Sequence, residues 1–189
     1  MSKIVFHGDS VTLGVRAGVV KADTYAQRVG LARGFSSIVN TGIGGNTSTA
    51  GLARFGSDVL AQSPDAVSIM FGINDVYAAT PPATYKANLR QMVAMAKDAG
   101  IRATVLSASF VRSTPYINAF PAYLDAAQEA AQSEGVPFVD CYREFEHAYF
   151  LPLPMVFDAL HVDHQHPAPA GHKLIADLIC KPANAAACS

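Results

Sequence analysis

The stretch Lys3-Ile4-Val5-Phe6-His7-Gly8-Asp9-Ser10 determines the fold that we expect for this chain. Its apolar centre, residues 4–6, is typical of a short buried strand. Gly8 then permits a sharp turn, and Ser10 follows at the point where the strand should end. In parallel α/β sheets, reactive groups gather beyond the carboxyl ends of the strands. Ser10 is therefore the first candidate functional residue.

The rest of the chain continues the alternation of strands and helices. Short apolar runs predict strands over residues 3–7, 37–40, 66–71, 102–107 and 138–141. Between them, helices are expected over residues 24–32, 48–62 and 119–133. One more helix has Tyr85, Leu89, Met92, Val93 and Ala96 on one face, and a final helix contains Leu174, Ile175, Leu178 and Ile179. This rhythm predicts an α/β fold, a three-layer α/β/α sandwich with about five parallel strands.

Composition places the chain among soluble globular domains. It has 189 residues, of which 50% are hydrophobic and 15% charged, so it can bury a core and is not disordered. We expect a single domain over residues 1–181 and a C-terminal tail over 182–189. The net charge of −1 gives no argument for nucleic acid as a partner. No apolar run is long enough for a membrane span.

Two features bear on the cellular compartment. The first strand begins at Lys3 and leaves no room for a signal peptide, so the chain as written is expected in the cytoplasm, or outside it if a leader has been removed. Cys141 is expected to be buried. Cys180 and Cys188 flank a segment rich in proline and alanine, and we leave open whether they form a disulfide. That bond would favour an oxidising compartment.

Four segments carry polar groups where loops should follow the strand ends. They are Ser10, residues 40–47 (Asn-Thr-Gly-Ile-Gly-Gly-Asn-Thr), residues 72–75 (Gly-Ile-Asn-Asp) and residues 163–167 (Asp-His-Gln-His-Pro). Singly, each is also compatible with a helix cap, a turn or an Asx turn. Together they contain what acyl transfer requires, which is a nucleophile, a base, a group that orients the base, and donors for an oxyanion.

The roles can be assigned by residue type. Ser10 is the candidate nucleophile, His166 its base and Asp163 the carboxylate that orients the imidazole. The Gly45 amide and the Asn74 side chain are candidate oxyanion donors. We expect Asp9 and Asp75 to be structural, bonding loop backbone near the site.

The four blocks, taken in order, resemble the SGNH hydrolases, also called the GDSL-like esterase/lipase superfamily. The matching positions are Gly8-Asp9-Ser10 with Gly14, Asn40-x-Gly42-x-x-Gly45-x-Thr47, Gly72-x-Asn74-Asp75, and Asp163-x-x-His166-Pro167 with Gly171 and His172. The resemblance implies a flavodoxin-like fold and serine esterase activity without a cofactor. It also implies that the Ser10 amide joins Gly45 and Asn74 in the oxyanion hole.

The last block contains a second Asp-x-x-His pair, Asp158 and His161. We prefer Asp163 and His166, because Pro167, Gly171 and His172 then lie at the family's spacing before the final helix. The choice between the two pairs stays open at this point.

Two other function classes remain to be weighed. His161, Asp163, His164, His166 and His172 lie within twelve residues and are all possible zinc ligands, but this spacing is no recognised ligand pattern and leaves Ser10 and Asn74 unused. A binding domain that has lost its chemistry would usually lack the serine or the histidine. We therefore expect no metal and no cofactor.

Substrate is expected to be a carboxylic ester with a short acyl group, and O-acetyl esters of carbohydrates are favoured because no lid insertion is evident. Short-chain lipase, thioesterase and lysophospholipase activities are the alternatives within the family. Candidate cleft-wall residues are Val11, Ile73, Val76, Phe110 and Met155. The sequence does not indicate the oligomeric state.

Overall fold

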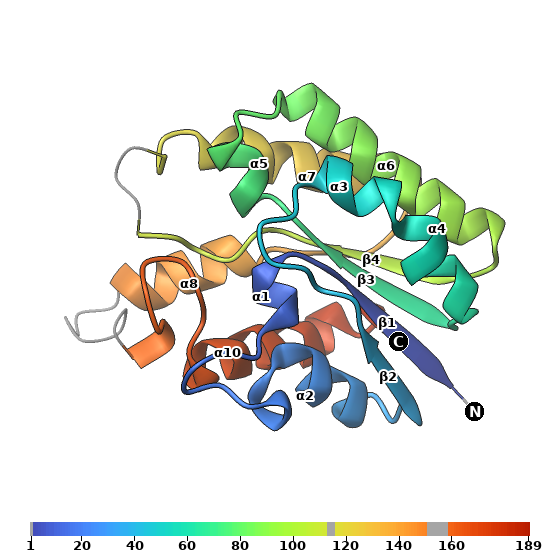
Figure 1. Ribbon diagram of the computed structural model, residues 1–189, viewed down its shortest axis with the longest axis horizontal. Helices are drawn as coiled ribbons and strands as arrows, with labels where there is room; N and C mark the ends of the chain where they lie inside the picture. Colours follow the sequence, from blue (N-terminus) through green and yellow to red (C-terminus); the bar gives the residue numbers. More distant parts are fainter. Residues whose placement is uncertain (1, 113–115, 151–158) are drawn as a thin grey trace.

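The centre of the structure is a parallel sheet of five strands. The computed structural model describes residues 2–112, 116–150 and 159–189. The strands lie in the order β2-β1-β3-β4-β5 and all neighbours pair in parallel (Figure 1). They are β1 (Lys3–Gly8), β2 (Ser37–Asn40), β3 (Ala66–Met70), β4 (Arg102–Leu106) and β5 (Phe138–Val139). The five predicted strands are confirmed.

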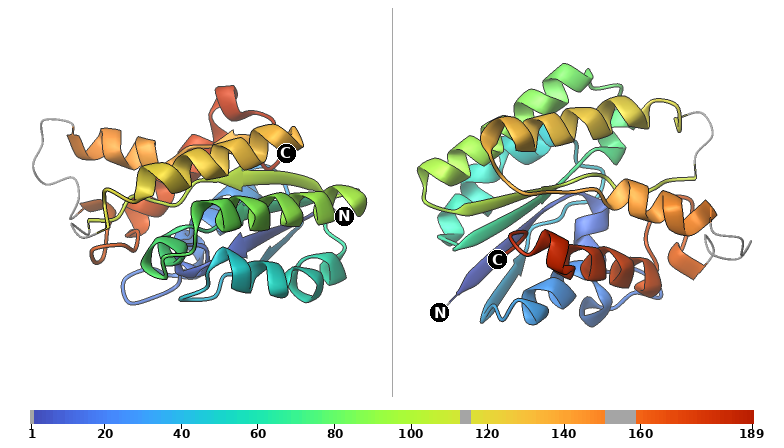
Figure 2. Two further views of the ribbon diagram at one scale, coloured as in Figure 1. Left: turned by 90° about the horizontal axis from the view of Figure 1, so that it is seen from above. Right: turned by 180° about the vertical axis from the view of Figure 1, so that it is seen from behind.

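Helices cover both faces of the sheet, as Figures 1 and 2 show. Helices α2 (Tyr25–Ala32) and α10 (Pro169–Cys180) pack together on one face. On the other face lie α3 (Ser48–Ala53), α4 (Phe55–Asp58), α6 (Pro82–Asp98) and α7 (Phe120–Glu134). Shorter α1 (Ser10–Leu13) and α5 (Ile73–Tyr77) follow β1 and β3, and α8 (Cys141–Phe150) follows β5. In the described part of the chain, no helix is long and apolar enough to cross a membrane. The predicted three-layer α/β/α fold is confirmed.

The sheet and the helix faces supply the core. All five residues of β3 are buried, and Ile4, Val5 and Phe6 of β1 have no exposed surface. Strands covered on both faces need such continuous apolar runs. The predicted face of α6 is buried as well, because its apolar residues recur at helical spacing and point at the sheet. That face consists of Tyr85, Leu89, Met92, Val93 and Ala96.

Two elements differ from the prediction. The single helix expected over residues 48–62 is divided into α3, α4 and a 3₁₀ turn, Leu60–Gln62. The first break falls at Arg54, which is the C-cap of α3 and the N-cap of α4. Its backbone φ is −105°. The strand expected over residues 138–141 ends at Val139. There Asp140 accepts a hydrogen bond from the Arg143 amide (3.0 Å), and this cap starts α8 at Cys141, a helix that the sequence analysis missed.

The C-terminal residues pack against the domain instead of standing off as a tail. Arg33 donates to the carbonyls of Ile179 (2.8 Å) and Asn184 (3.1 Å). The Cys188 amide donates to Thr104 on β4 (2.9 Å). All three cysteines are free, so Cys180 and Cys188 form no disulfide here, and Cys141 is buried as predicted.

The turn after β1 leaves no space for a side chain at position 8. A Cβ atom there would lie 2.1 Å from Thr12 Oγ1 and 2.5 Å from the Met70 carbonyl oxygen. Gly8→Ala should therefore destabilise the protein by about 1–3 kcal/mol through overpacking, measured by urea denaturation. Gly56 on α4 is the matched control, because a Cβ there meets nothing within 4 Å. Gly56→Ala should be neutral or stabilising, and equal losses in both variants would contradict this account.

Candidate active site

Ser10 is the first residue of α1, directly beyond the carboxyl end of β1. Asp9 is the N-cap of this helix, and its Oδ1 accepts a hydrogen bond from the Val11 amide (2.9 Å). Capping of this kind satisfies an amide that the first turn leaves without a partner. The cap and the tight turn at Gly8 therefore fix the direction in which Ser10 leaves the sheet.

Ser10 lies at one end of a chain of three hydrogen-bonded side chains. His166 Nε2 is 3.0 Å from Ser10 Oγ, and His166 Nδ1 is 2.7 Å from Asp163 Oδ2. A carboxylate can only accept, so Nδ1 carries the proton and Nε2 is free to accept from the Ser10 hydroxyl. The three residues come from opposite ends of the sequence, and the fold brings them together.

The loop before α10 holds Asp163 in place. Its second oxygen, Oδ1, accepts from the Gln165 amide (2.9 Å) and the His166 amide (2.8 Å). Partial burial opposes ionisation of Asp163, but the hydrogen bonds from His166 and from these amides lower its pKa to about 2. Asp163 is thus ionised at neutral pH, as a partner for an imidazolium must be.

The competing histidine, His161, points elsewhere. It is 6% exposed, its Nε2 lies 3.0 Å from the Phe110 carbonyl oxygen, and its ring packs on Phe145 (centroids 5.2 Å). Its neighbour in the alternative pair, Asp158, lies outside the described residues. The position beside Ser10 is held by His166.

The histidines near the C-terminus do not converge on one point. His172 is buried against α2, where its Nδ1 accepts from the Tyr25 amide (3.3 Å) and its ring stacks on Tyr25 (6.1 Å). His166 and His161 face Ser10 and Phe110 respectively. Among the residues that the structure describes, no three His, Cys, Asp or Glu side chains are grouped to hold a metal ion.

The glycine-rich loop after β2 packs closely on α1. A Cβ at Gly42 would lie 2.1 Å from the Leu13 amide nitrogen, so only glycine allows this approach. Two residues on, the Cβ position of Gly44 is 3.9 Å from Ser10 Cβ. Within the described parts of the chain, the amides of Ser10 and Gly45 form no protein hydrogen bond. Their part as donors to an oxyanion stays a prediction.

Asn74, at the start of α5, completes the set of predicted donors. Its Nδ2 donates to the Asn46 carbonyl (3.0 Å) and lies 3.5 Å from Asp9 Oδ2. The first bond orients the amide, and the longer contact is weak. Because only one of the two N–H groups is firmly held, the other remains available for a ligand.

The two buried aspartates near Asn74 bond backbone amides in the first turns of helices, where loop backbone was expected. Asp75 Oδ2 accepts from the Ser48 amide (2.9 Å), and Asp75 Oδ1 accepts from the Ser48 hydroxyl (2.6 Å). Burial raises the pKa of Asp9 to about 7, opposed by the Val11 amide and reinforced by Asp75. Asp75 thus ties α5 to α3, and Asp9 caps α1.

Arg16 is a contact that the sequence analysis missed. Its Nη2 donates to the Ser10 carbonyl (3.2 Å) and its Nη1 lies 3.9 Å from Asp163 Oδ2. Burial lowers the pKa of His166, Arg16 lowers it further, and Asp163 raises it; the net shift is downward. No spacing rule distinguishes such an arginine from one that is merely solvated.

Four of the five expected cleft-wall residues are buried in the core. Val11, Ile73, Val76 and Phe110 are 1, 3, 4 and 2% exposed, so they support the loops from below. Met155 lies outside the described residues. A part for any of them in acyl binding stays a prediction.

A serine, a histidine and an aspartate joined in this way, at the strand ends of a three-layer α/β/α domain, define a serine-dependent class of hydrolases. The chain belongs to the GDSL-like Lipase/Acylhydrolase family, whose model matches residues 6–174. It is accordingly an ester hydrolase of the SGNH type, as the resemblance predicted.

Individual relatives agree with this assignment. The chain is 31% identical over 201 residues to an acetylxylan esterase of Geobacillus stearothermophilus, covering 92% of this chain and 90% of the relative. It is 27% identical over 186 residues to an arylesterase of Vibrio mimicus, covering 95% and 86%. Among solved structures, an alpha/beta hydrolase enzyme from the metagenome of Lake Arreo, Spain, aligns with a TM-score of 0.81 at 27% identity, covering 100% of this chain and 97% of that one.

The charges around His166 predict how its imidazole titrates. Arg16→Gln removes a nearby positive charge that disfavours the imidazolium, so the pKa of His166 should rise. Asp163→Asn removes the favourable carboxylate, so the pKa should fall. Both shifts can be measured by NMR titration of labelled histidine. Lys173→Gln breaks only an exposed pair with Asp177 and should leave the pKa of His166 unchanged. A fall in the pKa of His166 in Arg16→Gln would contradict the placement of Arg16 beside His166.

Proposed function

We propose that the protein is a serine esterase that removes short acyl groups, acetyl first, from hydroxylated substrates such as carbohydrates. The observation that carries the proposal is the chain of hydrogen bonds from Ser10 through His166 to Asp163, at 3.0 and 2.7 Å. It is supported by solved catalytic variants of the Geobacillus acetylxylan esterase, which replace a serine, an aspartate and a histidine, the last two three residues apart. Asp163 and His166 have the same spacing.

In the proposed mechanism, Ser10 Oγ attacks the ester carbonyl while His166 Nε2 takes the hydroxyl proton. Asp163 stabilises the imidazolium and holds its tautomer. The oxyanion accepts hydrogen bonds from the Ser10 and Gly45 amides and from Asn74. His166 then protonates the departing alcohol. Water, activated by the same histidine, releases the acid and restores Ser10.

The burial of apolar residues beneath the site supports the proposed preference for small acyl groups. Among the described residues, Val11, Ile73, Val76 and Phe110 are packed into the core, so they offer little surface on which a long acyl chain could be buried. One relative is an acetylxylan esterase, which supports acetyl as the acyl group. The other relative is an arylesterase, which supports testing phenolic leaving groups.

The proposal is tested by hydrolysis of p-nitrophenyl acetate, butyrate and octanoate. The wild type should favour the acetate, and Ser10→Ala and His166→Ala should each lose about 10³-fold or more in kcat. His161→Ala is the matched control and should keep kcat within about tenfold, because its ring bonds a core carbonyl outside the triad.

Two results would contradict the proposal. Retained turnover in Ser10→Ala would remove the serine mechanism, and a preference for octanoate would remove the short-acyl assignment. A larger loss in His161→Ala than in His166→Ala would move the base to the other pair.

A further inference from the structure

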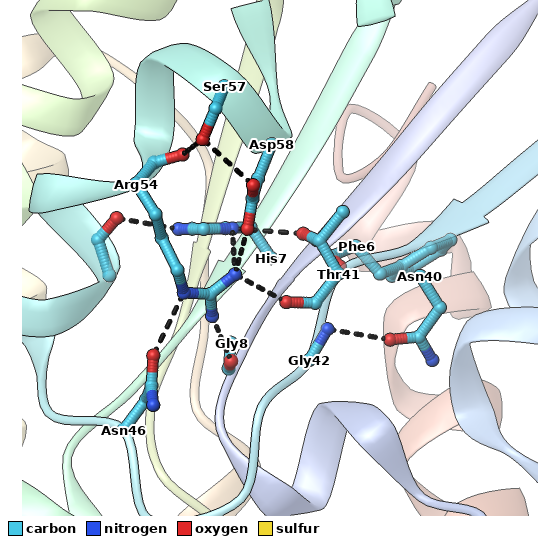
Figure 3. Close-up of polar contacts among 11 residues, drawn as sticks. Phe6, His7, Gly8, Asn40, Thr41, Gly42, Asn46, Arg54, Ser57 and Asp58 are labelled. Atoms are coloured by element: carbon cyan, nitrogen blue, oxygen red, sulfur yellow. Dashed lines mark hydrogen bonds and ion pairs between the residues drawn. The ribbon is translucent and has the colours of Figure 1, made fainter.

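The guanidinium of Arg54 lies among three segments that lead into the active site (Figure 3). Its Nη2 donates to the Gly8 carbonyl at the end of β1 (2.8 Å), and its Nη1 donates to the Thr41 carbonyl just after β2 (2.6 Å). Its Nε donates to the Asn46 side chain (2.8 Å), at the far end of the glycine-rich loop. One planar group thus joins the turn before Ser10 to both ends of the loop that contains Gly45.

The guanidinium of Arg54 is largely buried and lies in an ion pair. Its side chain is 14% exposed and pairs with Asp58 on α4 (2.6 Å). Although burial opposes ionisation, hydrogen bonds from Arg54 and Ser57 hold the pKa of Asp58 below its usual value. A planar donor with fixed geometry can satisfy several acceptors at once, which a lysine ammonium on a flexible stem cannot.

The imidazole of His7 lies beside the Arg54 guanidinium. Its Nε2 lies 3.0 Å from the Gly51 carbonyl oxygen and therefore carries the proton, while Nδ1 faces Thr41 Oγ1 (2.9 Å) and Arg54 Nη1 (3.4 Å). Burial and the charge of Arg54 lower the pKa of His7 to about 4. The imidazole is thus uncharged at neutral pH and does not repel Arg54.

The contacts continue from Arg54 to the candidate oxyanion donors. The Gly8 carbonyl, which Arg54 holds, also accepts from the Ile43 amide (3.1 Å). Arg54 donates to the side chain of Asn46, and the backbone carbonyl of Asn46 accepts a hydrogen bond from the side-chain amide of Asn74 (3.0 Å). Gly45 lies between Ile43 and Asn46. Each predicted donor is therefore close to a residue that Arg54 contacts. Gly45 precedes Asn46, Asn74 bonds the Asn46 carbonyl, and Ser10 follows Gly8 by two residues.

We propose that Arg54 is a positioning residue that aligns the oxyanion donors for the transition state without touching the substrate. This inference rests on the proposed function, because it assumes that Ser10, Gly45 and Asn74 bind the oxyanion. A misplacement of about 1 Å at such a site costs on the order of 10²-fold in rate. The effect of losing Arg54 should therefore appear in kcat.

The test compares Arg54→Lys with Asp58→Asn, using p-nitrophenyl acetate. Arg54→Lys keeps the charge but cannot reach Gly8, Thr41 and Asn46 together, so kcat should fall about 10²-fold with KM changed less than about threefold. Asp58→Asn breaks the ion pair and leaves the three loop contacts, so its kcat should stay within about threefold of the wild type. Thermal denaturation of both variants separates loss of folded protein from loss of alignment.

A second readout uses a transition-state mimic. Ethylboronic acid forms a tetrahedral adduct with a reactive serine and places an oxygen among the oxyanion donors. Its inhibition constant should rise in Arg54→Lys in proportion to the fall in kcat/KM, which a merely structural role would not produce. Asn46→Ala removes the acceptor of Arg54 Nε but keeps the carbonyl that binds Asn74. It should show part of the same loss, and the loss in the double variant should be less than the product of the two single losses.

The outcomes distinguish this inference from the proposed function. Wild-type kcat and boronate affinity in Arg54→Lys would overturn the role of Arg54, as would an equal loss in Asp58→Asn. If Arg54→Lys does not fold, wild-type activity in Asn46→Ala would overturn the positioning role of Arg54 instead. Turnover that survives in Ser10→Ala would overturn the proposed function itself, and only then would the inference lose its premise.

Discussion

The turn from β1 into α1 at Gly8 is the constraint on which the site depends, because Thr12 and the Met70 carbonyl occupy the space that a Cβ atom would need there. The turn puts Ser10 directly at the strand end, and the Asp9 cap fixes the helix that carries it. The next strand imposes a second close approach, where Gly42 packs on the backbone of Leu13. The donors of the loop and the serine are therefore held by backbone packing before any substrate arrives.

Much of this arrangement could be predicted from the sequence. The strands are short apolar runs, and their parallel order brings the residues that follow them to one edge of the sheet. This is why Ser10, Gly45 and Asn74, which follow three of the strands, are expected at one site. The pairing of His166 with Ser10, rather than His161, depended on the geometry of the loop before α10, which the family spacing indicated but residue type alone did not.

The residues that the sequence analysis missed act through long-range contacts of side chains. Arg54 and Asp58 look like an ordinary exposed pair on one helix. In the structure, the helix breaks at Arg54 and the guanidinium points into the loops. Arg16 likewise bonds a carbonyl and a carboxylate that only the fold brings near. For the expected cleft-wall residues, apolar type does not distinguish a pocket wall from a core residue, so their part in acyl binding stays a prediction.

The central claim is that Ser10 becomes acylated during turnover, and trapping the acyl-enzyme tests it most directly. The wild type would be mixed rapidly with p-nitrophenyl acetate and quenched in acid, and its peptides would be analysed by mass spectrometry. The account predicts one acetyl group on the peptide that contains Ser10, located on that residue by fragmentation and absent from His166→Ala. Acetyl on a different residue, or turnover by His166→Ala at the wild-type rate through an acetylated Ser10, would contradict it.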